Sequence, residues 1–154
     1  MRRDCQKSGL AGEMFVAAEL LKREFQVSLT LGNAKSIDIF AYSETDERTY
    51  EVQVKTLRTS NCYLLKIQDI IPEHIYVFVL LHKPGQPVEY FILRGKEIIK
   101  NEKTLYGGGD GKQKMSGILM RPLKAYKDRW DIFEKGRVKP NQRIQADAGC
   151  RPRG

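Results

Sequence analysis

Three polar side chains stand out because of their types and spacing: Asp38, Gln53 and Lys55. Asp38 lies in the segment S-I-D-I-F-A-Y, and the other two lie in Y-E-V-Q-V-K-T. Carboxylate and amide oxygens are ligands that suit Mg²⁺. A nearby ammonium group can help to orient a water molecule or to stabilise charge that develops on a phosphoryl oxygen. The combination predicts hydrolysis of a phosphodiester bond.

Both segments alternate apolar and polar residues, which is typical of strands with one buried face. In the second segment Gln53 and Lys55 share one face of the strand, and Val52 and Val54 occupy the other. The link between the segments is short and polar, so we expect a hairpin. In that hairpin Asp38 lies beside Gln53 and Lys55.

An upstream helix is predicted from about Gly9 to Glu24, with Ser8 as its N-cap. At about 100° per residue, apolar side chains form one stripe along it. The members of this stripe are Leu10, Met14, Ala17, Leu21 and Phe25. Glu13 lies at the border of the stripe, so it can reach the edge of the sheet on which the helix packs.

The remaining elements follow from the same patterns. Strands are predicted over 25–31, 75–81 and 88–94, the second of them continuous, β-branched and buried. A short helix follows the last strand, and residues 123–133 form an amphipathic helix with Trp130 and Phe133 inward. Three consecutive strands after one helix predict an antiparallel meander packed on that helix.

The order of helix glutamate, D-I-F-A-Y and E-V-Q-V-K-T resembles the PD-(D/E)XK nuclease superfamily. The resemblance covers about residues 9 to 94 and is to its Gln-x-Lys variant, found among Mrr-type restriction, resolvase-like and group I intron homing endonucleases. It implies an α/β (α+β) fold with a restriction-endonuclease-like αβββαβ core, in which helices flank a mixed sheet. It also implies an intracellular, cytoplasmic DNA endonuclease of prokaryotic or phage origin.

Carried over residue by residue, the resemblance makes Asp38 the principal metal ligand, with Gln53 and Glu13 completing the site, and makes Lys55 the catalytic lysine. The implied cofactor is Mg²⁺, for which Mn²⁺ can substitute. Two departures stand out. Ser36-Ile37 replaces the proline that names the superfamily, and the neutral Gln53 holds a divalent cation more weakly than a carboxylate does. Either Glu51 compensates from the same strand face, or the site has decayed.

The charge of the chain is polarised. The net charge is +8, yet residues 9 to 93 hold eight Lys or Arg against eleven acids, whereas residues 94 to 129 hold ten against four. A basic surface attracts the phosphate backbone of nucleic acid. The candidate DNA contacts in or near the glycine-rich segment 106–117 are Lys112, Lys114, Arg121 and Lys124.

Length and composition predict one nuclease-like domain over residues 1–134, followed by a basic, disordered tail over 135–154. Neither a secretory signal nor an apolar run of membrane-spanning length is present. The three cysteines are widely separated and lack a C-x-x-C pair, which argues against a disulfide framework or a zinc finger. Because one such site cuts one strand, we expect a homodimer or a larger homo-oligomer.

Three alternatives remain open at this point. A nucleic-acid-binding or assembly module could keep the fold without cleaving, and Gln53 in place of an acid favours it. A basic RNA-binding protein is a second option, although the aromatic signature of common RNA-binding sheets is absent. In the third, Asp38, Glu51 and Lys55 form only cross-strand ion pairs on a solvated sheet face.

Overall fold

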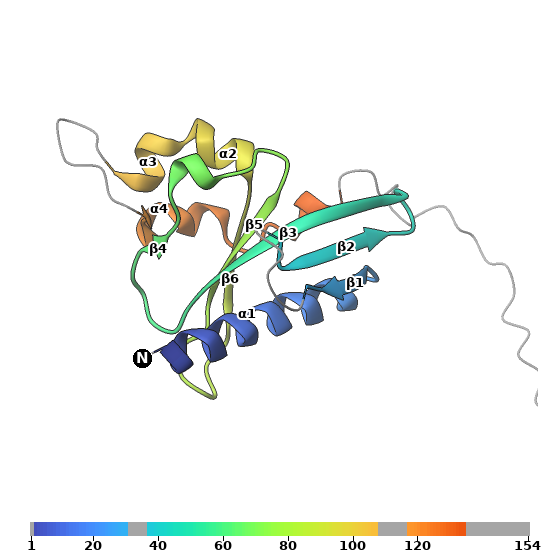
Figure 1. Ribbon diagram of the computed structural model, residues 1–154, viewed down its shortest axis with the longest axis horizontal. Helices are drawn as coiled ribbons and strands as arrows, with labels where there is room; N and C mark the ends of the chain where they lie inside the picture. The colour runs from blue at the N-terminus through green and yellow to red at the C-terminus, as the bar shows by residue number, and fades with distance from the viewer. Residues whose placement is uncertain (1, 31–36, 108–116, 135–154) are drawn as a thin grey trace, which may run out of the picture.

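The computed structural model describes residues 2–30, 37–107 and 117–134 (Figure 1). The elements in chain order are α1 (Arg2–Lys22), β1 (Gln26–Leu29), β2 (Ile39–Ser43), β3 (Arg48–Leu57), β4 (Tyr63–Leu64), η1 (Ile67–Asp69), β5 (Ile75–Leu80), β6 (Glu89–Arg94), α2 (Gly95–Lys100), α3 (Glu102–Tyr106), β7 (Gly117–Ile118), α4 (Met120–Leu123), η3 (Lys124–Tyr126) and η4 (Trp130–Phe133). The predicted turn at 32–35, most of the glycine-rich segment and the tail lie outside the described residues.

The main sheet has five strands in the order β1-β2-β3-β5-β6. Strands β1, β2 and β3 form the predicted antiparallel meander, β5 pairs parallel to β3, and β6 pairs antiparallel to β5. The sheet is therefore mixed and flanked by helices, as the α/β prediction requires. The crossover from β3 to β5 contains β4 and η1 instead of an α-helix.

Two apolar layers hold the sheet between its flanking elements. On one face, α1 contributes Val16 and Leu20 to a core that also contains Val52 and Val54 of β3. On the other face, residues of β4, α2 and α3 pack against β5 and β6 around the fully buried Phe78. Figure 1 shows α1 on one side of the sheet and α2, α3 and β4 on the opposite side. Strand β3, an inner strand of the sheet, therefore lies between these two apolar layers.

Helix α1 differs from the prediction in its start and in the face that it buries. It begins at Arg2, so Ser8 is an interior residue, and the predicted stripe is largely exposed: Leu10, Met14 and Leu21 are 47%, 48% and 57% accessible. The buried face runs instead through Ser8, Gly12, Val16 and Leu20. A Cβ on Gly12 would lie 1.9 Å from Thr56 Oγ1, so the missing side chain lets the helix backbone approach β3 closely.

The C-terminal segment is the second departure from the predicted elements. The helix expected over 123–133 is wrong, because α4 passes into a single 3₁₀ turn and the chain then becomes extended at Lys127. Asp128 follows with a positive φ of 52°, a conformation that interrupts a right-handed helix. Trp130 and Phe133 nevertheless point inward as predicted, at 6% and 0% exposure.

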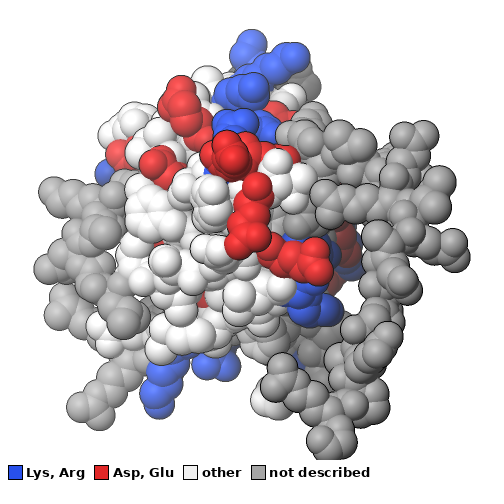
Figure 2. Space-filling model, turned by 90° about the vertical axis from the view of Figure 1, so that its right-hand side faces the viewer, with Lys and Arg blue, Asp and Glu red and all other residues white. Residues whose placement is uncertain are grey.

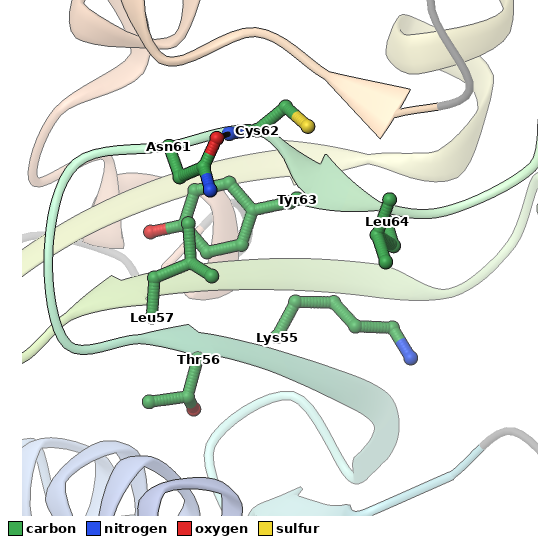
Figure 3. A pocket seen from close by; sticks show the side chains of 7 residues that line it. All are labelled: Lys55, Thr56, Leu57, Asn61, Cys62, Tyr63 and Leu64. Carbon is green, nitrogen blue, oxygen red and sulfur yellow. Dashed lines mark hydrogen bonds between the residues drawn. The ribbon is translucent and has the colours of Figure 1, made fainter. Parts of the chain in front are cut away.

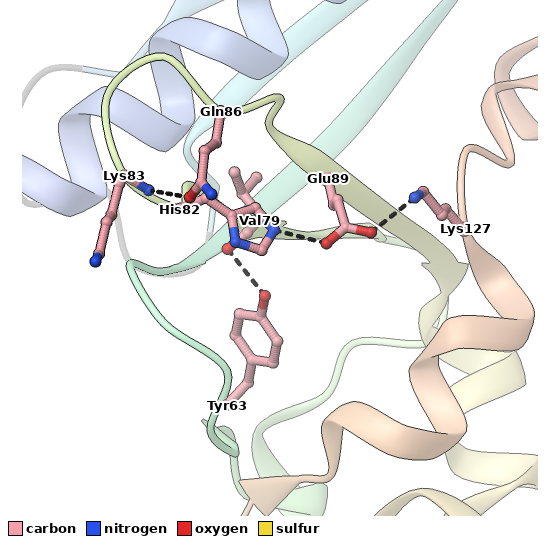
Figure 4. Close-up of polar contacts among 7 residues, drawn as sticks. All are labelled: Tyr63, Val79, His82, Lys83, Gln86, Glu89 and Lys127. Carbon is pink, nitrogen blue, oxygen red and sulfur yellow. Dashed lines mark hydrogen bonds and ion pairs between the residues drawn. The ribbon is translucent and has the colours of Figure 1, made fainter.

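Polar contacts fasten this segment to the sheet. Lys127 Nζ donates to Glu89 Oε1 at 2.7 Å, and His82 Nε2 lies 2.6 Å from the other carboxylate oxygen of Glu89 (Figure 4). His74 and His82 lie just before and just after β5. Among the helices of the described part of the chain, none has the length and apolar character needed to span a membrane.

Candidate metal and phosphodiester site

Strand β3 sorts its side chains onto two different faces. Val52 and Val54 are 0% and 8% exposed and join the core beneath α1. Gln53 and Lys55 alternate with them and therefore point to the opposite face. On one side β3 pairs with β5 along its length, with Gln53 level with Tyr76 and Lys55 level with Phe78. The predicted placement of Gln53 and Lys55 on one face is thus confirmed.

Asp38 lies where β2 and β3 separate. Ile39 is level with Val52, and the Asp38 N–H donates to the Val52 carbonyl at 3.0 Å. At Val54 a side chain takes the place of the β2 backbone as the hydrogen-bond partner of β3. The Asp38 Oδ2 accepts from the Val54 N–H at 2.7 Å. A charge-assisted bond of this kind fixes the carboxylate against β3, between the positions of Gln53 and Lys55 along the strand.

Glu13 reaches the same edge from α1. It is half-buried on the helix, one residue after the glycine that permits the close approach to β3. Burial raises the pKa of the Glu13 carboxyl, and the negative charge of Asp38 raises that pKa further. Glu13 therefore lies within electrostatic reach of Asp38. Two like charges at one edge are stabilised when a cation lies between them.

Gln53 supplies the third oxygen. Its Oε1 is buried, and no donor in the described part of the chain reaches it. A buried acceptor without a partner costs about 1–3 kcal/mol, so its presence calls for a donor or a cation. The Val54 carbonyl points toward the same neighbouring strand as the Val54 N–H, which is the side of Asp38.

The donor set fits a hard divalent cation. It comprises the carboxylates of Glu13 and Asp38, the amide oxygen of Gln53 and a main-chain carbonyl, all of them oxygen ligands of the kind that Mg²⁺ selects. Within the described residues no three His, Cys, Asp or Glu side chains gather into a metal-binding group. A cation at this place would have at most these two carboxylates as charged ligands, and neutral oxygens would have to complete the set.

Lys55 is two residues farther along the same face. Neither Lys55 nor Asp38 forms an ion pair with any residue that the structure describes, so the alternative of simple cross-strand ion pairs finds no support at these two positions. Lys55 lines a pocket of about 350 Å³ beside the site (Figure 3). The other lining residues are Thr56, Leu57, Asn61, Cys62, Tyr63 and Leu64.

Glu51 does not point to the site as a free carboxylate. Its Oε2 lies 2.7 Å from Nε2 of His74, which is 5% exposed. His74 precedes β5, and β5 is the parallel neighbour of β3. The alternative in which Glu51 compensates for Gln53 therefore finds no support, because His74 at the start of the neighbouring strand holds its carboxylate.

The predicted nucleic-acid contacts are only partly described. Lys112 and Lys114 lie outside the described residues, whereas Arg121 and Lys124 are exposed on α4 and η3. Figure 2 shows the side of the molecule at the right of Figure 1, where Asp and Glu side chains gather across the middle of the face. A face with this charge repels anions such as a phosphate group.

Sequence reasoning missed the residues that form the pocket wall opposite Lys55. Asn61, Cys62 and Leu64 belong to the segment after β3, which has no clear periodicity. The one available signal was the run Y-L-L at Tyr63–Leu65. In the structure the Leu64 side chain is 77% exposed, whereas Tyr63 and Leu65 are 2% and 7% exposed, which is the alternation of a strand.

Comparison with known proteins shows similarity to a solved structure. No protein-family model and no curated protein sequence matches the chain. Among solved structures, the bacterial homing endonuclease I-Ssp6803I is similar, with a TM-score of 0.54 and 16% sequence identity over 84% of this chain and 91% of that chain. Similarity at this low identity shows the fold. The described chain thus has a mixed α/β fold of a kind that is found in a nuclease.

Proposed function

We propose that this protein is a divalent-metal-dependent DNA endonuclease of the PD-(D/E)XK type. The single observation that carries the proposal is the Asp38 carboxylate bound to the Val54 N–H, on the strand that carries Gln53 and Lys55. Glu13 within electrostatic reach of Asp38, and the unpartnered Gln53 oxygen, support the same assignment. The fold shared with a homing endonuclease agrees with it.

Each site residue has a distinct role in the proposal. Glu13, Asp38 and Gln53 hold Mg²⁺, or Mn²⁺ in its place, and the Asp38–Val54 bond keeps the carboxylate in position. The bound metal supplies Lewis-acid polarisation of the phosphodiester and a more acidic water. Lys55 donates hydrogen bonds that orient water or stabilise charge on a phosphoryl oxygen.

DNA is the proposed substrate, and the basic segment that follows β6 is proposed to contact its backbone. Arg121 and Lys124 are exposed there. Such contacts position the duplex without reading its sequence, so each removed cation should weaken binding and reduce its salt dependence. Since one site cuts one strand, double-strand cleavage requires a homodimer or a larger assembly.

The test is cleavage of supercoiled plasmid DNA in Mg²⁺ or Mn²⁺. Asp38→Asn keeps an acceptor for the Val54 N–H but removes the charge, and Lys55→Ala removes the ammonium. We expect each to lower the cleavage rate about a hundredfold or more. The matched controls are Asp69→Asn and Lys66→Ala, which alter exposed residues of the neighbouring segment and should cleave like the parent. Equal rates in all five proteins would contradict the assignment.

The second candidate function is a DNA-binding module that keeps the fold but does not cleave. The neutral Gln53, together with Glu51 bound to His74, favours it because both reduce the negative charge available for a metal. Calorimetric titration with Mn²⁺ separates the two functions. Binding that is lost in Asp38→Asn supports the nuclease, whereas DNA binding without Mn²⁺ binding supports the module.

A further inference from the structure

The pocket beside Lys55 has different chemistry at its two ends. Figure 3 shows the Lys55 ammonium at one end, near Leu64, and the Asn61 amide at the other, with Leu57 and the Tyr63 ring between them. Its volume of about 350 Å³ falls within the range of small-ligand sites. A fitting ligand is therefore anionic at one end and flat or apolar in its middle.

Two polar side chains at the ends of the pocket, Asn61 and Lys55, present hydrogen-bond donors. Asn61 Oδ1 already accepts from the Cys62 N–H at 2.8 Å, which leaves the Asn61 NH₂ group to face a ligand. The ammonium of Lys55 also only donates. The Tyr63 hydroxyl donates to the Val79 carbonyl at 2.9 Å and is not available as a donor (Figure 4). A ligand must therefore bring acceptors to both ends.

The Leu64 side chain lies exposed at the rim of the pocket, on a strand whose neighbouring residues are anchored. It is 77% exposed, yet its neighbours Tyr63 and Leu65 are buried. Tyr63 also packs edge-on against Phe78 at a ring distance of 5.0 Å. On the other side β4 pairs with β7, where a Cβ on Gly117 would lie 2.4 Å from the Tyr63 carbonyl oxygen. An apolar side chain held out on an anchored strand can insert between stacked bases.

We propose that this pocket receives one nucleotide of the bound DNA, unstacked from its neighbours. Its phosphate lies at Lys55, its sugar and base lie along Leu57 and Leu64, and an acceptor on the base edge meets the Asn61 amide. This inference rests on the proposed endonuclease function, because it makes Lys55 the shared boundary between the cleavage site and the nucleotide pocket. Leu64 occupies the gap that the displaced base leaves in the stack.

A nucleotide explains the pocket better than free phosphate does. Phosphate would use the Lys55 end and leave the apolar middle and the Asn61 end empty. A base presents carbonyl or ring-nitrogen acceptors at its edge, such as O6 and N7 of guanine, which match the NH₂ donor of Asn61. Unstacking one base costs a few kcal/mol, and contact with the apolar wall offsets part of it.

The experiment is a nuclear magnetic resonance titration of the full chain in EDTA, without metal. The probes are dGMP, deoxyguanosine and inorganic phosphate, and the reporters are the Asn61 side-chain NH₂ and the methyl groups of Leu57 and Leu64. We expect dGMP to shift all three reporters, and phosphate to leave the Asn61 and Leu57 signals unchanged. Identical shifts with dGMP and phosphate would overturn the proposal.

Two pairs of variants locate the binding. Asn61→Asp keeps the acceptor for the Cys62 N–H and replaces the donor with a negative charge, so dGMP should bind about tenfold more weakly. Gln68→Glu makes the same charge change at an exposed position of η1 and should bind like the parent. Leu64→Ala should also weaken binding, whereas Leu21→Ala, on exposed α1, should not. Parent-like affinity in Asn61→Asp rejects the pocket.

The outcome is separable from that of the cleavage test. The titration contains no metal and reads no cleavage. Loss of the dGMP shifts in a protein that still cuts plasmid DNA rejects the nucleotide pocket alone. Specific dGMP shifts in a protein that neither binds Mn²⁺ nor cuts DNA reject the endonuclease alone.

Discussion

The two faces of β3 differ in how they satisfy their side chains. Toward α1, Val52 and Val54 are buried in a close-packed apolar core. Toward the other face, Gln53 has a buried oxygen without a partner and Lys55 has no ion pair within the described part of the chain. The face toward α1 stabilises the fold by apolar packing, whereas the opposite face holds polar groups without hydrogen-bond or ion-pair partners. A strand that holds unsatisfied polar groups at one place is typical of a binding site.

The largest effect on stability is expected from disrupting the close packing of α1 on the apolar face of β3. Gly12→Ala places a Cβ 1.9 Å from Thr56 Oγ1 and 2.9 Å from Thr56 Cβ, so α1 must move off β3. We expect a loss of about 3 kcal/mol in the free energy of unfolding, measured by urea denaturation. The control is Gly9→Ala on the same helix, where nothing lies within 4 Å. It should be neutral or slightly stabilising, because alanine favours a helix.

A double substitution sharpens this result. Thr56→Ala removes Oγ1, which lies 1.9 Å from the new Cβ, and Cγ2 at 2.9 Å, and leaves the Thr56 Cβ at 2.9 Å. Gly12→Ala in that background should therefore cost less than it does alone. Equal cost in both backgrounds would mean that close approach of α1 to β3 is not the reason for glycine at position 12.

The second effect compares adjacent residues on the two faces. Val52→Ala opens a cavity at a fully buried position and should cost about 2 kcal/mol, with Mn²⁺ affinity little changed. Gln53→Ala removes the unpartnered buried oxygen, so stability should be unchanged or higher while Mn²⁺ affinity falls. Thermal unfolding and calorimetric titration measure the two quantities separately. A stability loss in Gln53→Ala as large as that in Val52→Ala would assign Gln53 to the core.

How far the sequence predicts the fold depends on the range of the interactions involved. Strands β3 and β5 were predictable because alternation and continuous apolar runs are local signals. The buried face of α1 was not, because it depends on the contact between Gly12 and Thr56, which hydrophobicity does not register. The interrupted C-terminal helix depends on Asp128 in a left-handed conformation, and no glycine marks that position.

The same distinction applies to the candidate site. Asp38 and Gln53 could be placed together because the hairpin that links them is short and its register follows from alternation. The binding of Glu51 by His74 requires the parallel pairing of β3 with β5, whose register no turn fixes. The pocket was equally hidden, since the display of Leu64 depends on pairing with Gly117, far along the chain.

The third effect tests whether the polar face is short of negative charge. Gln53→Glu adds a carboxylate beside Asp38. We expect Mn²⁺ to bind about tenfold more tightly, or about 1.4 kcal/mol, because a charged oxygen replaces a neutral one. Without metal the variant should unfold at a lower temperature, since a third negative charge joins Glu13 and Asp38. Unchanged Mn²⁺ affinity would place the metal elsewhere.

The smallest effect follows from the raised pKa of Glu13 and has a definite sign. Because the folded-state pKa lies above the ordinary value of 4.5, ionisation of Glu13 disfavours the folded state. The favourable contribution is complete below that ordinary value and is lost as the pH rises through the folded-state pKa. Glu13→Gln should therefore match the parent near pH 3 and be slightly more stable than the parent near pH 8 without metal, and the difference is small because Glu13 is only half-buried.

Divalent metal should reverse this difference. A cation held by Glu13 and Asp38 favours both ionised forms, so Mg²⁺ should raise the melting temperature of the parent more than that of Glu13→Gln. Glu73→Gln, at an exposed position before β5, is the control and should follow the parent with and without metal. If the difference between Glu13→Gln and the parent is independent of both pH and metal, Glu13 packs at the sheet edge without sharing a cation with Asp38. In that case Asp38 and Gln53 alone would have to hold the metal, and α1 would supply no ligand.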